Sequence, residues 1–195
     1  INATFDAGLI HGVIGKNGAG KTVLLRLLCG LMHPSKGQVI VDGKQLGKDV
    51  DFAPDAGIII ETPCFLPYLS GFQNLKELAS IRNIISKEEI AEAMEQVKLD
   101  PSSRKHVGKY SLGMRQRLGI AQAIMERPRY LILDEPMNGL DTQGMEDVRE
   151  LLQKQKETGV TVILASHSME DIRLLCDTVH RIQDASLIPC TTEFS

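Results

Sequence analysis

Residues 15–22 read Gly-Lys-Asn-Gly-Ala-Gly-Lys-Thr, and this stretch decides most of what the sequence predicts about the fold. The apolar run Leu9–Ile14 before it predicts a buried strand, and the leucine-rich segment Gly20–Leu31 after it predicts a helix. Glycines at such a junction let backbone N–H groups curve around phosphate oxygens, and the helix N-terminus favours an anion. A glycine-rich turn without a ligand is the alternative, but both flanks match a phosphate-binding loop.

The composition is that of one ordinary globular domain. Its 195 residues carry 22 Lys+Arg against 25 Asp+Glu, a net charge of −3, and 43% are hydrophobic. This balance lacks the basic excess of nucleic-acid binders, so we expect no nucleic-acid partner. No apolar run approaches the ~18 residues of a membrane span. The sequence contains no Cys-x-x-Cys pair. We therefore expect its four cysteines to be reduced and mostly buried thiols of a cytosolic protein; they are Cys29, Cys64, Cys176 and Cys190.

Strands and helices alternate along much of the chain, which predicts an α/β fold with a parallel sheet and crossover helices. The further strands are expected at Gln38–Val41, Gly57–Ile60, Tyr130–Leu133, Val160–Ala165 and Thr178–Ile182, and the later helices at Asp141–Glu157 and Ser168–Cys176.

The middle of the chain is different. Ser70 with Gln73 and Ser86 with Glu89 have the spacing of helix capping boxes, and each precedes helical periodicity. We therefore predict a small helical insertion at about residues 70–97 within a single domain whose core comprises residues 1–69 and 98–195.

Several polar residues stand where chemistry is expected. Asp134 and Glu135 end a buried strand, at the edge where parallel sheets bind ligands. Lys21 would neutralise phosphate charge, Thr22 and Asp134 would hold Mg²⁺, and Glu135 would activate water. A solvated turn is the alternative for the two carboxylates, and the phosphate loop upstream favours a site. His167 follows another strand and is expected at the same sheet edge, although lone histidines are often structural.

Residues 110–117 open a helix for which Ser111 is a suitable N-cap. Together, Gly15–Thr22, Tyr110–Gln116, Leu131–Glu135 and His167 resemble the Walker A, signature, Walker B and switch-histidine motifs of ABC-type ATPases, and Asn138–Asp141 resembles their D-loop. The resemblance covers essentially the whole chain. It implies a P-loop NTPase with a RecA-like core, an inserted helical subdomain, and ATP and Mg²⁺ as cofactors.

The resemblance also implies a head-to-tail pair of nucleotide-binding domains, in which each signature faces the partner's ATP. The catalytic residues would be Glu135, His167 and Glu61, and the metal residues Thr22, Asp134 and Glu61. The nucleotide would contact Gly15, Lys16, Asn17, Gly18, Ala19, Gly20, Lys21, Thr22 and Val23 and, in trans, Ser111 and Gly113.

Two departures narrow the family. The signature has Tyr110, Leu112 and Met114 where the family has Leu, Gly and Gln, and Glu61 stands in place of the Q-loop glutamine. A carboxylate at this position could face Mg²⁺ but adds negative charge near the nucleotide; an exposed loop residue unconnected with ATP is the alternative. With Glu61-Thr62-Pro63, the pattern resembles the bacterial exporters linked to bacitracin and lantibiotic resistance or self-immunity, which implies export of peptide antibiotics.

The resemblance implies an ATP-hydrolysing exporter subunit, homo- or heterodimeric, in the cytoplasm at the inner face of the membrane and bound to integral-membrane permease subunits. The alternatives are a soluble ABC ATPase in DNA repair or translation and an inactive regulatory module. The apolar loop Cys64–Leu69 would receive a permease helix, pack beneath the helical insertion, or both.

The chain begins at Ile1, which we interpret as an N-terminal truncation that removes the adenine-stacking aromatic of the family. Phe5 is not that residue, because strand alternation with Ile1 and Ala3 favours a core position.

Overall fold

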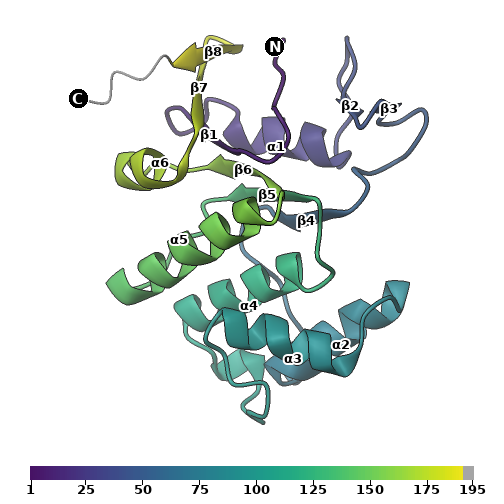
Figure 1. The fold of residues 1–195 in the computed structure, drawn as a ribbon, viewed down its shortest axis with the longest axis vertical. Helices are drawn as coiled ribbons and strands as arrows, with labels where there is room; N and C mark the ends of the chain where they lie inside the picture. The colour runs from purple at the N-terminus through teal and green to yellow at the C-terminus, as the bar shows by residue number, and fades with distance from the viewer. Residues whose placement is uncertain (191–195) are drawn as a thin grey trace.

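A computed structural model describes residues 1–190, in which a six-stranded sheet is covered by helices on both faces (Figure 1). The strand order is β4-β5-β6-β1-β7-β8, and all neighbours are parallel except β8, which runs antiparallel to β7. The strands are β1 (Ile10–Ile14), β4 (Ala56–Ile59), β5 (Tyr130–Asp134), β6 (Thr161–Ala165), β7 (Thr178–Gln183) and β8 (Ser186–Cys190). The predicted parallel sheet is confirmed, and β8 is an addition to it.

Successive side chains of a strand point to opposite faces of the sheet. Because helices cover both faces, the side chains on both are buried. On β5, Leu131 and Leu133 join the core under α4 and α5, whereas Ile132 joins the core under α1. A short antiparallel pair, β2 (Ile40–Val41) and β3 (Lys44–Gln45), lies outside this sheet. The helices are α1 (Lys21–Cys29), α2 (Gly71–Arg82), α3 (Lys87–Gln96), the 3₁₀ helix η1 (Val107–Lys109), α4 (Leu112–Ile124), α5 (Thr142–Glu157) and α6 (Met169–Leu175).

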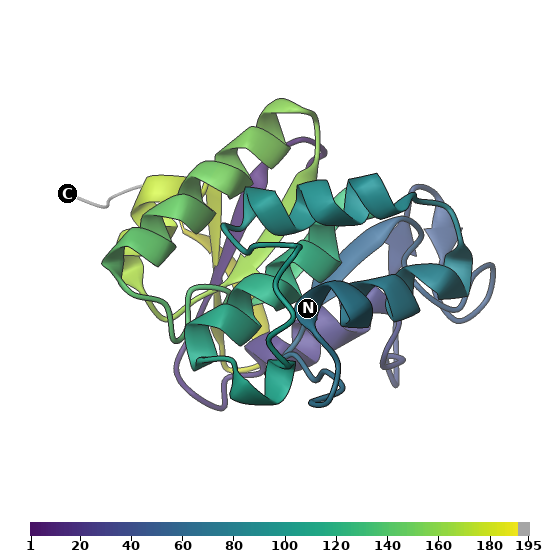
Figure 2. The same cartoon turned by 90° about the horizontal axis from the view of Figure 1, so that it is seen from below.

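The helical insertion contains α2 and α3, and both of its predicted capping boxes are present. Ser70 and Ser86 each accept a hydrogen bond from the backbone of the residue three positions on, and that residue's side chain reaches back to the cap. In Figure 1, α2, α3 and α4 gather at the end of the molecule opposite β7 and β8. Figure 2 looks from that end and shows α2 and α3 in front of the sheet.

The expected strand alternation at the N-terminus was wrong, because residues 1–6 form no strand. Phe5 nevertheless packs against the core, where it is half-buried with its ring edge-on to His11 and His180. The four cysteines are free, as predicted, but only Cys29 is buried and Cys64 is exposed. Burial raises the pKa of the Cys29 thiol to about 12, which keeps it protonated. Within residues 1–190, no helix has the length and apolar character needed to cross a bilayer.

Candidate functional site: a nucleotide cleft at the sheet edge

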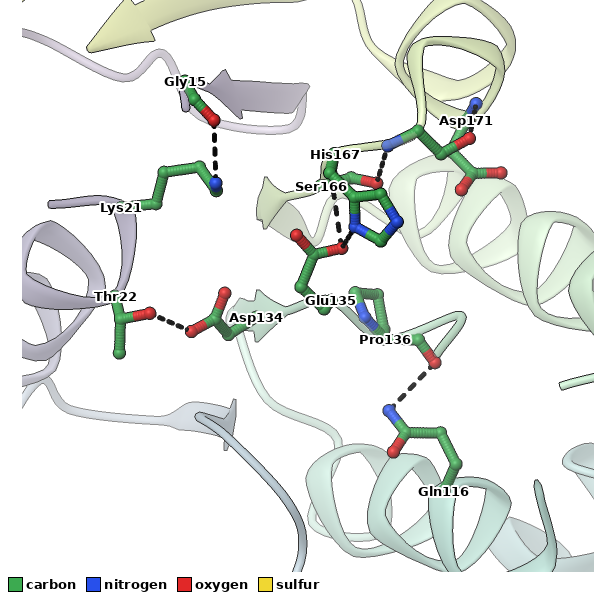
Figure 3. Close-up of polar contacts among 11 residues, drawn as sticks. Gly15, Lys21, Thr22, Gln116, Asp134, Glu135, Pro136, Ser166, His167 and Asp171 are labelled. Atoms are coloured by element: carbon green, nitrogen blue, oxygen red, sulfur yellow. Dashed lines mark hydrogen bonds and ion pairs between the residues drawn. The ribbon is translucent and has the colours of Figure 1, made fainter. Parts of the chain in front are cut away.

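The loop after β1 has the conformation that its glycines predict. Gly20 caps the N-terminus of α1 with a φ of 103°, a left-handed conformation that side chains disfavour. Lys21 begins the helix and is only 8% exposed, and its Nζ donates a hydrogen bond of 2.9 Å to the carbonyl of Gly15 (Figure 3). This contact closes the loop on itself and holds a cation at the start of α1, where an anion is favoured.

Thr22 and Asp134 meet across the cleft although 112 residues separate them in the chain. The Thr22 hydroxyl donates a hydrogen bond of 2.6 Å to Oδ2 of Asp134, which is 7% exposed (Figure 3). A hydroxyl and a carboxylate are the hard oxygen ligands that Mg²⁺ prefers, beside water and phosphate. This donor pair fits the predicted metal.

Glu135 and His167 meet at the ends of the neighbouring strands β5 and β6, as their sheet-edge positions predict. Nδ1 of His167 lies 2.8 Å from Oε2 of Glu135, and the backbone N–H of His167 donates to the same oxygen at 3.3 Å. Glu135 has a φ of 49°, and its own N–H donates to the carbonyl of Ala165. A glutamate in this less favoured region is held by its surroundings, here by β6 and the histidine.

These residues line a cleft of about 610 Å³, a volume that suits a nucleotide. From the predicted set, the cleft includes Lys16, Asn17, Gly18, Gly20, Lys21, Thr22, Val23, Glu61, Asp134 and Glu135. Glu61 therefore faces the cleft, and its carboxylate accepts a hydrogen bond from Arg26. Gly15, Ala19 and His167 line a second cavity on the other side of the loop.

Ser111 and Gly113 do not line this cleft. Ser111 is the N-cap of α4, as predicted, and its Oγ accepts a hydrogen bond from the Met114 N–H. Their contact with ATP therefore stays a prediction that requires a second domain.

Sequence reasoning assigned no role to Gln116, although it lies in the quoted signature. Its side chain is 6% exposed and donates to the Pro136 carbonyl, which ties α4 to the residue after Glu135. Arg26 was also missed, since nothing in its local sequence marks it as part of the site.

A profile of the ABC transporter family matches residues 1–138, which include the loop and the strand that ends in Asp134 and Glu135. The chain belongs to the ABC transporter family. This ABC domain is an ATP-binding ATPase, and the predicted fold is confirmed.

Curated relatives lead to the same family. The chain is 46% identical to the uncharacterized ABC transporter ATP-binding protein YybJ of Bacillus subtilis, over 91% of this chain and 81% of that protein. It is 40% identical to the bacitracin transport ATP-binding protein BcrA of Enterococcus faecalis, over 96% of this chain and 62% of that protein. It is 34% identical to the lantibiotic transport ATP-binding protein SrtF of Streptococcus pyogenes, over 96% and 81%. The chain thus spans about three fifths of the length of BcrA and about four fifths of the other two.

A solved structure shares the fold. The dimeric bacterial ABC transporter cassette MJ0796 superposes with a TM-score of 0.85 at 22% identity, over 96% of this chain and 86% of that one. The relatives support an ATP-binding subunit of a transporter and not the alternative of an ABC ATPase in DNA repair or translation.

Proposed function

We propose that this ABC domain binds ATP with Mg²⁺ in the cleft between α1 and β5 and hydrolyses it to power export through separate membrane subunits. The observation that supports this most strongly is the convergence of Lys21, the Thr22–Asp134 pair and the Glu135–His167 pair in and beside one cleft. Lys21 and the loop amides would bind the β- and γ-phosphates. Thr22 and Asp134 would hold Mg²⁺, which supplies charge neutralisation at the phosphates.

Glu135 is proposed to be the general base. Both contacts from His167 go to Oε2, which leaves Oε1 to accept a proton from the attacking water. The histidine fixes the carboxylate's orientation, and its second ring nitrogen can serve the γ-phosphate. Glu61 is proposed to act beside them from the same cleft, toward the hydrated metal.

A second nucleotide-binding domain is proposed to complete the site. Ser111 and Gly113 stand at the N-terminus of α4, where backbone N–H groups and a serine can meet an anion. They lie outside the cleft of their own chain. The dimeric state of the MJ0796 cassette supports a head-to-tail pair in which they reach the partner's ATP.

The membrane partner is proposed to dock on the loop Cys64–Leu69. In this proposal the loop both packs beneath the helical insertion and receives a permease helix. Phe65 packs against the core, whereas Leu66 and Tyr68 are 43% and 64% exposed. The loop is fixed from below because the buried Asn74 hydrogen-bonds both the N–H and the carbonyl of Leu66. An integral-membrane permease would place the domain at the cytoplasmic face, and the names of BcrA and SrtF favour peptide antibiotics as substrates.

The test compares Glu135→Gln with wild type. The variant should bind ATP with Mg²⁺ at least as tightly as wild type, form a nucleotide-dependent dimer, and lose turnover by about a hundredfold or more. Glu150→Gln, an exposed position on α5, is the matched control. Turnover that survives Glu135→Gln would overturn the assignment of the base.

For transport, disruption of the gene should sensitise the host to bacitracin or a lantibiotic, and unchanged sensitivity to both would remove peptide antibiotics as substrates.

A further inference from the structure

Arg26 lies on α1 one helical turn after Thr22, so both side chains lie on the same face of the helix. Its Nη2 donates a hydrogen bond of 2.5 Å to Oε1 of Glu61, the loop residue that follows β4. The proposed mechanism leaves this arginine without a role. The contact joins α1, the helix that follows the phosphate loop, to Glu61, the carboxylate that stands in place of the family's Q-loop glutamine.

The charges of the cleft explain why such a contact is needed. Among the residues that line it, Lys16 and Lys21 face three carboxylates, those of Glu61, Asp134 and Glu135. A triphosphate would therefore enter a site in which acidic side chains outnumber basic ones. Arg26 does not line the cleft itself but contacts Glu61. Its positive charge makes the number of basic side chains equal to the number of acidic ones.

The backbone places Glu61 where this compensation matters. Its φ of 63° is left-handed, a conformation uncommon for residues other than glycine, and directs the side chain from the end of β4 toward α1. The side chains of Arg26 and Glu61 are 37% and 63% exposed. Ion pairs this exposed add little to folding stability. The effect of the pair is therefore expected on a charged ligand more than on stability.

We propose that Arg26 is a positioning residue that holds and neutralises Glu61, which allows the cleft to carry this carboxylate when ATP binds. The inference rests on the proposed nucleotide site. It goes beyond that site because it states that the charge of Arg26 offsets the unfavourable negative charge of Glu61 near the nucleotide. It predicts that Arg26 matters for nucleotide affinity only while position 61 is charged.

A double-mutant cycle tests this dependence. The dissociation constant of AMP-PNP with Mg²⁺ is measured by calorimetry at low salt for wild type, Arg26→Gln, Glu61→Gln and the double variant. Arg26→Gln should weaken binding about fivefold, the upper end for an exposed charge pair. The double variant should bind like Glu61→Gln, because Arg26 has no charge at position 61 left to neutralise, and any contact of Glu61 with the metal cancels in this comparison. Arg26→Lys keeps the charge and should stay within about twofold. An equal loss from Arg26→Gln in both backgrounds, or no loss in either, would overturn the proposal.

Three controls separate this pair from general effects. Arg129→Gln removes an exposed arginine that pairs with Asp42 at the opposite end of β5, and it should leave affinity unchanged. Thermal unfolding of the cycle variants should match that of wild type. About 1 M salt should shrink the fivefold loss, since screening acts on exposed charges.

The outcomes also separate this inference from the function on which it rests. If wild type fails to bind AMP-PNP, or Lys21→Ala binds as well as wild type, the proposed nucleotide site fails and the inference with it. If binding requires Lys21 but the cycle shows no coupling, only the role of Arg26 fails. If Glu61→Gln hydrolyses ATP at the wild-type rate, the catalytic role of Glu61 fails, while the cycle still decides the role of Arg26.

Discussion

Arg149 of α5 donates hydrogen bonds from Nε and Nη2 to a single oxygen of Asp171 in α6, and this carboxylate is almost completely buried. Helix α6 follows directly on His167, and Ser168 caps it by accepting a hydrogen bond from the Asp171 N–H. The pair therefore fixes α6, which follows His167, to α5, which follows residues 138–141. Its side chains are 15% and 3% exposed, which places it among the partly buried ion pairs.

We expect Asp171→Ala to destabilise the fold by about 3–5 kcal/mol, because it leaves a mostly buried guanidinium without its partner. Urea unfolding measures the loss. Glu170→Ala is the control, since Glu170 is 71% exposed and lies 3.7 Å from the same guanidinium. The control should change stability by less than about 0.5 kcal/mol. Similar losses in the two variants would contradict the role of burial.

Thr22→Val removes the hydroxyl that contacts Asp134 and keeps the side-chain shape. We expect affinity for ATP with Mg²⁺ to fall about tenfold, as for the loss of a hydrogen bond to a charged group. Affinity for ATP in a chelator should change little, because the hydroxyl is proposed to serve the metal. Calorimetry under both conditions checks this, and equal losses would show that Thr22 acts on the phosphates instead.

Gly57 lets β4 approach α4 closely. A Cβ at this position would lie 1.9 Å from the carbonyl oxygen of Ala123, a backbone atom that cannot move aside alone. Gly57→Ala should therefore cost at least about 3 kcal/mol in urea unfolding.

Gly37→Ala is the control for Gly57→Ala. Its φ is +85° and its Cβ would meet nothing within 4 Å, so only the left-handed backbone cost of about 1–2 kcal/mol is expected. A smaller loss at Gly57 than at Gly37 would contradict the close approach of the strand and the helix.

Asp147 of α5 gives the fold a defined pH dependence. A hydrogen bond from Arg117 of α4, supported by the arginine's charge, holds the pKa of this carboxyl below its usual value. A lowered folded-state pKa adds stability that is fully present above the unfolded pKa of about 3.9 and lost as pH falls through the folded pKa. The stability gap between wild type and Asp147→Asn should thus be constant near neutral pH and shrink below about pH 4.

Urea unfolding over a pH series measures this gap, with Glu146→Gln on the same helix as the control. A gap that stays constant into acid would show that Arg117 does not favour the charged form of Asp147.

The exposed loop before α2 should transmit permease contact. Tyr68→Ser is expected to weaken binding to the membrane subunits and lower transport-coupled turnover, while nucleotide affinity stays at the wild-type value. Ile81→Ser is the matched control, because Ile81 is 79% exposed near the other end of α2. Co-purification from membranes and ATP turnover with the permease check this. Equal losses in the two variants would move the docking surface elsewhere.

Local patterns determined much of this molecule in advance. The glycine loop between a strand and a helix, the two capping boxes and the Ser111 cap depend on contacts within a few residues, so the sequence specifies them directly. The meeting of Glu135 with His167 was also predictable, because parallel strands bring their carboxyl ends to one edge of the sheet.

Contacts between distant segments were decided only by the tertiary structure. Arg26 and Glu61 are 35 residues apart and Arg149 and Asp171 are 22 apart, and no periodicity marks any of the four as a partner. Strand order, the antiparallel β8 and the position of Phe5 likewise depend on which surfaces pack together. Hydrogen bonds within a turn follow from neighbouring residues, whereas packing and ion pairs across the fold depend on the whole chain. The sequence therefore determined the type of site, and the tertiary structure decided which side chains balance its charge.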